Sequence, residues 1–364
     1  MSNLPSPAAA RHRGPEINSL TALRGIAAWW VVFFHFDAFL RPYLPSPVYY
    51  AVSKGYLAVD LFFCLSGFVI YLNYGTLNIG SARELFVFYL RRIAKIYPLH
   101  LFVICLYGLL VIVLVLTHRD PSLRFSAPSL LLNLLLVQDW AVLNGLTWNV
   151  PSWSISAEFA AYLLFPVVVI LVGFVRGIIM RGFLAFCGLL ILLNLFYASW
   201  DFRIGSAIET LGAVRATAQF AIGALLAGFF LRMPITSRLL QASLLGLAAL
   251  LLCIGLAAME SLFIPPAWAS LVLAIALGDR KRGFLNHRWV VFIGHISYAT
   301  YMIHYFFRDV FKLAFVHANE TTPLYYVLDV FLAIFAASIP LYLYIERPAQ
   351  RYLTRKTSSQ KIPP

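Results

Sequence analysis

Residues 19–36 read SLTALRGIAAWWVVFFHF, an almost uninterrupted apolar run. Its length is close to the roughly 20 residues that a helix needs to cross the hydrocarbon core of a bilayer. The whole chain is similarly apolar, since 61% of its 364 residues are hydrophobic and only 12% are charged. A soluble domain is typically about 25% charged. So few charges could not cover a soluble globule, and we predict an all-α, polytopic membrane helix bundle.

Apolar runs of sufficient length predict about ten membrane spans. They are residues 19–40, 56–74, 97–117, 155–175, 182–199, 207–231, 239–259, 262–278, 289–307 and 324–345. An eleventh run, residues 129–143, is too short to cross and leads into a polar, aromatic segment, DWAVLNGLTWNVPSW. We expect this run to be a re-entrant or interfacial segment on the outer face.

The net charge of +13 follows from where the loops lie. With the N-terminus inside, 20 of the 28 Lys and Arg residues fall in cytoplasmic loops and 7 in outer loops, and Arg215 lies within a span. This asymmetry obeys the positive-inside rule and predicts that both termini are cytoplasmic. Counting residues 129–143 as a full span would place the basic cluster at 280–282 outside. The charge therefore gives no reason to expect a nucleic-acid partner.

A single membrane domain is expected over residues 19–346, between cytoplasmic tails at 1–18 and 347–364. The first tail is polar and lacks the apolar core of a signal peptide. The four cysteines lie within apolar runs and form no CxxC pair. We expect buried free thiols, with neither a disulfide framework nor a metal site.

Two ionisable side chains in neighbouring spans indicate a functional site, because a charge within the membrane is costly. Arg24 and His35 are eleven residues apart and so share one face of the first span. Asp60, near the outer end of the second span, should lie at a depth similar to that of His35. A contact between His35 and Asp60 would orient the imidazole as a general base. Alternatively, His35 could be a core histidine bonded to a backbone carbonyl, and Asp60 could form a structural helix–helix hydrogen bond. Close small-residue packing would explain Ser66 and Gly67.

Polar residues from two later spans reach the same outer third. Glu158 lies near the start of the fourth span, where Ser154 and Ser156 could alternatively form an N-terminal helix cap with it. In the ninth span the residues that share one face are Ser297, Tyr298, Tyr301 and His304. This face could instead belong to an aromatic belt.

A basic cluster marks the cytoplasmic mouth of the third span. Arg91, Arg92 and Lys95 suit phosphate groups, although they could be an ordinary positive-inside anchor. Near the C-terminus, Glu346 is expected to form a surface ion pair with Arg347 or Arg351.

A basic inner mouth and an outer histidine–carboxylate cluster suit group transfer from a phosphate-bearing cytoplasmic donor to an outer acceptor. The pantetheine arm of acetyl-CoA has about the length needed to reach mid-membrane. A proton-coupled transporter or flippase for a glycan or acyl carrier uses similar residues and stays an alternative. A scaffold for a polysaccharide synthase is a third.

Six motifs in order make the chain similar to the acyltransferase 3 family of integral membrane O-acyltransferases. They are the Arg24–His35 spacing, GYLAVDLFFCLSGFVIY, RRIAKIYPLH, PSWSISAEFAAYLLFP, GHISYATYMIH and IERPAQRYL. Lys95 stands where the family commonly has arginine. The resemblance implies acetyl transfer from acetyl-CoA to a carbohydrate hydroxyl or lipid-linked glycan at the bacterial inner membrane. It implies the stand-alone type, without a fused esterase-like domain.

Roles for individual residues follow from the resemblance and the spacing together. We expect His35 to be the catalytic base, with Asp60 or Glu158 supporting it. The residues expected to bind acetyl-CoA are Arg24, Arg91, Arg92, Lys95 and Ser66. Those expected to bind the acceptor are Trp153, Tyr298, Tyr301 and His304. No metal is expected, and the oligomeric state is left open.

Overall fold

The computed structural model describes residues 17–121, 123–175, 179–197, 203–205, 208–232, 237–278, 283–316 and 321–352. Within these ranges every regular element is a helix, so the predicted all-α bundle is confirmed. The first half holds α2 (Asn18–His35), α3 (Asp37–Leu40), α4 (Ser46–Ser53), α5 (Ala58–Tyr74), α6 (Ala82–Leu116), α7 (Ala127–Leu135), α8 (Trp153–Leu163) and α9 (Phe165–Val175). The second half holds α10 (Ile179–Tyr197), α11 (Ile208–Phe230), α12 (Arg238–Ala257), α13 (Glu260–Gly278), α14 (Arg288–His295), α15 (Ser297–Phe315) and α16 (Leu324–Leu341). Short 3₁₀ turns join several of them, and a π-helical turn, Tyr342–Glu346, continues α16.

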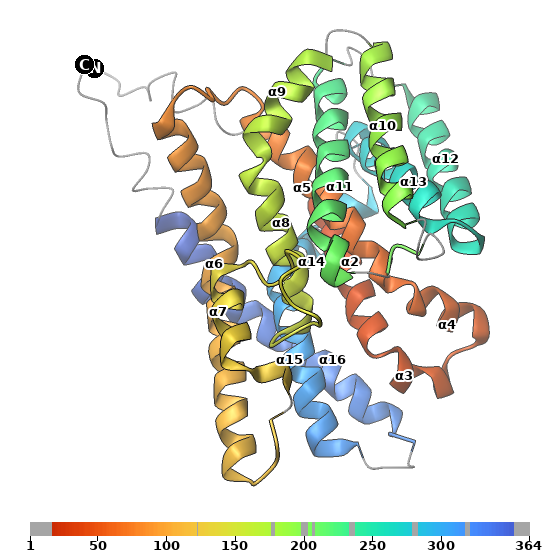
Figure 1. Ribbon diagram of the computed structural model, residues 1–364. Coiled ribbons are helices and arrows are strands. Elements are labelled where there is room, and N and C mark those ends of the chain that lie inside the picture. The colour runs from red at the N-terminus through yellow and green to blue at the C-terminus, as the bar shows by residue number, and fades with distance from the viewer. Residues whose placement is uncertain are drawn as a thin grey trace, which may run out of the picture.

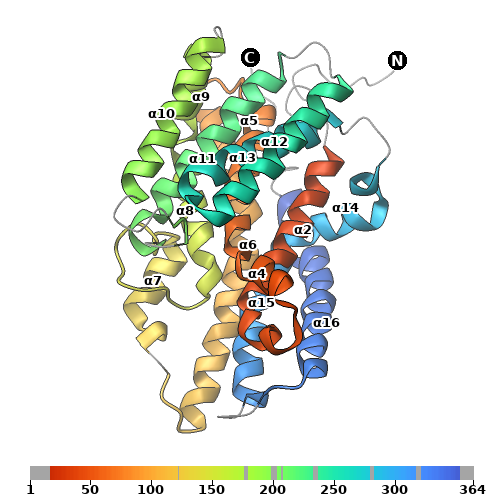
Figure 2. The ribbon, with the colours of Figure 1, turned by 90° about the vertical axis from the view of Figure 1, so that its right-hand side faces the viewer.

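The helices form two groups that Figures 1 and 2 show from perpendicular directions. Helices α10 to α13 lie together in the upper half of both views. Helices α3, α4, α7 and α15 lie in the other half, and α6 runs along both. Helices α5 and α8 pack between the groups against α11. Side chains from both groups can therefore meet around α5 and α8.

Six helices are long and apolar enough to cross a membrane, and up to nine segments qualify if each bent helix pair counts as one span. The chain is therefore a multi-pass membrane protein, although the predicted count of ten is not confirmed. The run expected at 182–199 falls on α10, whose described apolar part, Ala185–Leu195, is shorter than a span. The run at 129–143 gives only the nine residues of α7, in agreement with a segment that does not cross.

Three predicted spans are broken by bends that hydropathy does not reveal. Helix α2 turns by 73° into α3, α8 by 55° into α9, and α14 by 60° into α15. Pro166 explains the second bend, because its ring displaces the carbonyl one turn earlier and removes a helix hydrogen bond. After the third bend, α15 begins at Ser297, and the residues of its first turn are buried in the protein.

Helix α6 begins 15 residues earlier than the predicted span at 97, at Ala82. Ser81 caps its N-terminus, where the Ser81 hydroxyl accepts a hydrogen bond of 3.3 Å from the Glu84 amide. The basic cluster that was expected at the mouth of a span therefore lies within a continuous helix. Arg92 and Lys95, three residues apart, share one face of it, whereas Arg91 is rotated by about 100°.

Glycines bring α5 and α11 into close contact. A Cβ atom at Gly67 would overlap the carbonyl oxygen of Phe220, and one at Gly223 would overlap that of Cys64. Only glycine lets the two backbones approach this closely. Close small-residue packing, the alternative explanation for Gly67, is therefore what the structure shows at this glycine, and it holds the cavity wall formed by α5 in place.

Candidate active site

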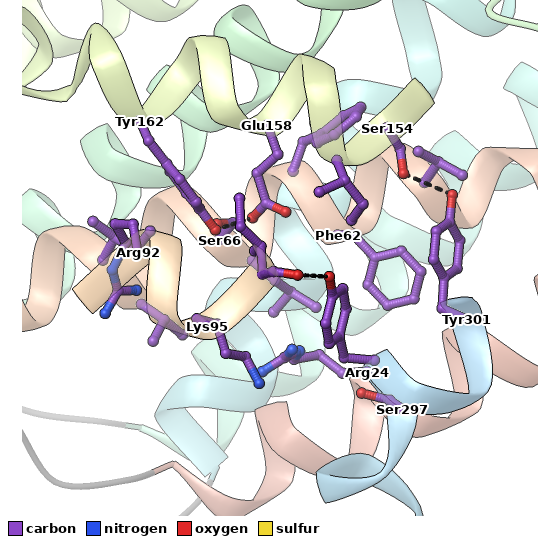
Figure 3. A pocket seen from close by; sticks show the side chains of 18 residues that line it. Arg24, Phe62, Ser66, Arg92, Lys95, Ser154, Glu158, Tyr162, Ser297 and Tyr301 are labelled. Atoms are coloured by element: carbon purple, nitrogen blue, oxygen red, sulfur yellow. Dashed lines mark hydrogen bonds between the residues drawn. The ribbon is translucent and has the colours of Figure 1, made fainter. Parts of the chain in front are cut away.

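A cavity with an empty volume of about 810 Å³, including its open mouth, lies between α5, α6, α8 and α15. We call it the main cavity. Its polar lining residues are Arg24, Ser66, Arg92, Lys95, Ser154, Glu158, Tyr162, Ser297, Tyr298 and Tyr301. Figure 3 shows Arg92 and Ser154 at opposite sides of it, with Glu158 between them. A largely apolar lining with a few converging polar groups is typical of a site for a small molecule or cofactor.

Positive charge gathers at the side of the main cavity formed by α6. Arg92 stacks on Tyr74, with its guanidinium carbon 5.2 Å from the ring centroid. Arg24 reaches in from α2 toward Lys95 (Figure 3). Arg91 does not line the cavity, as its rotated position on α6 requires. Two arginines and a lysine on one wall could hold an anion with several phosphate groups.

Lys95 has a partner that the sequence analysis assigned elsewhere. It forms an ion pair with Glu346, which is only 1% exposed. The prediction of a surface ion pair between Glu346 and its neighbouring arginines is therefore wrong. The π-helical turn after α16 points Glu346 toward α6, and this pairing offsets most of the lysine charge. Arg24 and Arg92 are left as the main sources of positive charge in the cavity lining.

The wall formed by α8 carries Glu158 and Ser154 into the cavity. Glu158 accepts a hydrogen bond of 2.6 Å from the Tyr162 hydroxyl, one helical turn later. Ser154 and the Tyr301 hydroxyl lie 2.8 Å apart, so α8 and α15 are joined at this point. No side-chain cap is found at the start of α8, and Ser156 donates instead to the Leu136 carbonyl. The alternative in which these serines cap the helix is therefore wrong.

His35 pairs with His304 rather than with a carboxylate. The Nδ1 atom of His35 is 3.0 Å from Nε2 of His304 and 3.1 Å from the carbonyl oxygen of Val31. His304 is fully buried, and its Nδ1 atom is 2.7 Å from the Tyr301 carbonyl oxygen. Arg308 donates a hydrogen bond of 2.6 Å to the His35 carbonyl. These contacts fix the C-terminal end of α2 and the rings of His35 and His304 relative to one another.

These contacts assign the tautomers of both histidines. A carbonyl oxygen can only accept, so Nδ1 of a neutral His304 carries the hydrogen and its Nε2 is an acceptor. The Nδ1 atom of His35 then faces two acceptors and must carry its own hydrogen. The lone pair of His35 is consequently on Nε2. A histidine held in one tautomer, with one nitrogen able to accept a proton, is suited to general-base chemistry.

Asp60 is bound by α11 and not by His35, which corrects the predicted His35–Asp60 contact. Arg215 donates from Nε and from a terminal nitrogen to the two carboxylate oxygens, at 2.8 and 2.5 Å. Gln219 adds a weaker bond of 3.4 Å. Both charged groups are almost completely buried, at 0% and 2% exposure. This forked geometry uses both carboxylate oxygens, so the pair is complete without a histidine.

The structure gathers seven of the twelve predicted site residues around the main cavity: Arg24, Ser66, Arg92, Lys95, Glu158, Tyr298 and Tyr301. The five that do not line it are His35, Asp60, Arg91, Trp153 and His304. The histidine pair lies next to it, since the ring of His304 is 5.8 Å from that of Tyr301. Arg215 was missed as a site residue, although an arginine inside an apolar span is itself a signal.

On the side away from the cavity, the histidine pair borders a charged and aromatic cluster. The ring of Tyr305 packs edge to face against His35 at 5.1 Å, and Arg308 lies over Tyr305 at 4.8 Å. Arg124 donates a hydrogen bond of 2.7 Å to Asp309. Among the residues that the structure describes, no group of three or more His, Cys, Asp or Glu side chains could hold a metal ion.

Comparison with known proteins adds two findings. Residues 17–343 match the model of a family described as an acyltransferase domain. Acyltransferase MdmB from Streptomyces mycarofaciens is 36% identical over 163 residues, which cover 42% of this chain and 38% of that protein. The chain thus aligns with less than half the length of that relative. No solved structure matches the chain.

Proposed function

The chain belongs to the acyltransferase 3 family, and from this premise we propose that it moves an acetyl group from acetyl-CoA to a hydroxyl of a carbohydrate or lipid-linked glycan. We propose the bacterial inner membrane as its location, with both termini cytoplasmic. The side of the main cavity near Arg24 and Arg92 would then open toward cytoplasmic acetyl-CoA. The observation that carries the proposal is a single cavity with cations on one side and a histidine pair beside the other.

The donor fits the main cavity in one direction. Arg24 and Arg92 would bind the CoA phosphates, because guanidinium forks suit phosphate oxygens. The pantetheine arm would run past Ser66 and Glu158 toward Tyr301. The lining between these groups is largely apolar, which suits the alkyl part of the arm. The thioester would then approach the joint between α8 and α15.

His35 would act as the base through Nε2. The acceptor hydroxyl gives its proton to Nε2 while its oxygen attacks the thioester carbonyl, which forms a tetrahedral intermediate. Collapse of that intermediate breaks the C–S bond, and the proton passes from the imidazolium to the departing CoA thiolate. His304 would position His35 by accepting its Nδ1–H. This role replaces the one expected for Asp60.

Tyr301 would separate the two substrates before reaction. It lines the main cavity, meets Phe62 edge to face at 5.7 Å and contacts His304 on the next turn. Its hydroxyl lies 2.8 Å from that of Ser154 and donates a hydrogen bond of 3.2 Å to the Pro151 carbonyl. Movement of this side chain would let the acetyl group reach His35, whose ring lies outside the cavity lining.

Binding of the donor is tested by thermal unfolding of the detergent-purified protein with and without acetyl-CoA. A ligand at about 100 times its Kd stabilises by about 2.7 kcal/mol, which corresponds to an increase in Tm of about 2 °C or more for a chain of this size. We expect the double variant Arg24→Gln/Arg92→Gln to lose the shift. The control variant Arg119→Gln, which changes an exposed arginine outside the cavity, should keep the increase in Tm.

The result also separates the enzyme from a transporter. An unchanged Tm at millimolar acetyl-CoA, in protein that unfolds cooperatively, would contradict the proposed donor. Glycan flux that depends on a proton gradient and needs no CoA would favour the transporter instead.

A further inference from the structure

A second, smaller pocket lies under the loop that follows α7, where this loop packs on α8 and α11. We call it the Asp139 pocket. Its lining residues are Gln138, Asp139, Gly145, Leu146, Thr147, Val150, Trp153 and Glu209. Its empty volume of about 230 Å³ includes space that is open to solvent, and the enclosed part is close to the room that one water molecule or one hydroxyl group needs. In Figure 1 the loop lies beside the first turns of α11.

Unpartnered acceptor atoms line this pocket. Asp139 is 2% exposed, yet no described residue donates a hydrogen bond to either of its carboxylate oxygens. The amide nitrogen of Gln138 is used, since it donates to the backbone and hydroxyl oxygens of Ser152 at 3.1 and 3.3 Å. The amide oxygen of Gln138 is again without a donor among the described residues. Three buried oxygens therefore lack hydrogen-bond partners among the residues that the structure describes.

The surroundings do not compensate Asp139. Burial raises the pKa of its carboxyl to about 9; Arg215 opposes the change, and Glu209 adds to it. Arg215 already binds both oxygens of Asp60. Gly212 leaves the carboxyl room against α11, because a Cβ there would overlap it. A buried polar group without a hydrogen-bond partner lowers the stability of the fold. Packing alone therefore does not explain why a carboxyl group stands at position 139.

Trp153 connects the Asp139 pocket to the main cavity. The indole lines the pocket, and its ring meets that of Phe63 edge to face at 6.1 Å. Phe63 lines the main cavity. A partition of two aromatic rings therefore separates the two spaces. A molecule held in the pocket would lie close to the donor on the other side of this partition.

We propose that the Asp139 pocket binds a hydroxyl-bearing part of the acceptor, as one sugar unit of a carbohydrate would present it. Hydroxyl groups can donate to the oxygens of Asp139 and Gln138 that lack partners, and Trp153, over whose ring Arg215 lies at 5.3 Å, closes one side of the pocket. The enclosed space limits the part that enters to about one hydroxyl group, with the sugar ring itself at the mouth of the pocket. The inference rests on the proposed function, because it takes the acceptor of that reaction as the ligand.

The variant Asp139→Asn tests the pocket in detergent-purified protein, with radiolabelled acetyl-CoA as donor. The acceptor probe is a lipid and polysaccharide extract of the cells from which the gene comes. We expect Asp139→Asn to need at least tenfold more extract for half-maximal transfer, with the half-saturating acetyl-CoA concentration unchanged. Its Tm should stay close to that of the wild type, because burial already holds the Asp139 carboxyl neutral near pH 7 and Asn replaces it with a neutral group of similar size. Asp120→Asn, at an exposed outer-loop position, is the matched control.

A second measurement does not depend on transfer. The extract alone, without acetyl-CoA, should raise the Tm of the wild type and of Asp120→Asn but not that of Asp139→Asn. Equal shifts in all three proteins, or no shift in any, would overturn the inference. An unchanged extract requirement with a raised Tm would mean that the pocket holds water only. If transfer fails while the Asp139-dependent shift persists, the proposed acetyl transfer is wrong and the binding site is not.

Discussion

Two buried polar pairs in this protein differ in what they leave unsatisfied. Asp60 and Arg215 join α5 to α11 through two hydrogen bonds of 2.8 and 2.5 Å, which use both carboxylate oxygens. His35 and His304 join α2 to α15 through one contact of 3.0 Å. In this second pair one ring nitrogen of His35, Nε2, keeps its lone pair. The first pair is a closed unit, whereas the second is built to accept a proton.

The difference separates stability from chemistry. A complete ion pair inside a protein fixes the arrangement of its helices, and removing one partner leaves an uncompensated charge. A neutral histidine pair carries a smaller desolvation cost and retains a reactive atom. We therefore expect damage to the first pair to unfold the protein, and damage to the second to stop the reaction in a folded protein.

The largest effect is expected for His35→Ala. Loss of a general base typically costs about 10²- to 10⁴-fold in rate, and we expect a fall of this size in acetyl transfer with radiolabelled acetyl-CoA. The stabilisation by acetyl-CoA should be nearly unchanged, because His35 does not line the main cavity, and the variant should still unfold cooperatively although its Tm falls with the loss of the ring contacts. His287→Ala, at an exposed histidine, serves as control. Wild-type acetylation by a folded His35→Ala protein would refute the base.

Opening the ion pair should mainly affect folding. In Arg215→Met the carboxylate of Asp60 stays buried without its cation, a situation that typically costs about 3–5 kcal/mol in the free energy of unfolding. The double variant Asp60→Leu/Arg215→Met removes both charges and should recover most of this loss. Unfolding in detergent, followed by tryptophan fluorescence, measures the difference.

The same double variant decides the role of Asp60. If it folds and transfers acetyl groups within tenfold of the wild-type rate, Asp60 has a structural role. A well-folded but inactive double variant would break the comparison, because it would return Asp60 to the catalytic machinery.

The sequence was sufficient for the fold class and for seven of the ten polar residues that line the main cavity. Long apolar runs predict helices by their length alone, and the spacing of Ser297, Tyr298 and Tyr301 predicts one helix face. All three residues line the main cavity. These features depend on residues close together in the chain, so periodicity and composition can predict them.

Long-range pairings could not be predicted from spacing. Asp60 binds a residue 155 positions away, and Lys95 binds one 251 positions away, on helices whose packing the hydropathy does not fix. The sequence could identify a partner for Asp60 only by its depth in the membrane. His35 and Arg215 both lie at a depth similar to that of Asp60, so this criterion does not choose between them. The close approach of α5 and α11 at Gly67 and Gly223 decides between them.

The smallest effect is expected for His304, which would act through His35 and touch no substrate. When His35 takes up a proton, its Nδ1–H bond becomes a bond from a charged donor, worth about 1.5–3 kcal/mol. Its loss in His304→Phe should lower kcat by about 10- to 150-fold, whereas KM for acetyl-CoA should not change. The carbonyl oxygen of His304→Gln can still accept from Nδ1, so this variant should keep more of the activity. Equal losses of kcat in both variants would show that His304 serves packing, and the histidine pair would then have a structural role like that of the ion pair. A rise in KM with unchanged kcat would show that His304 serves substrate binding.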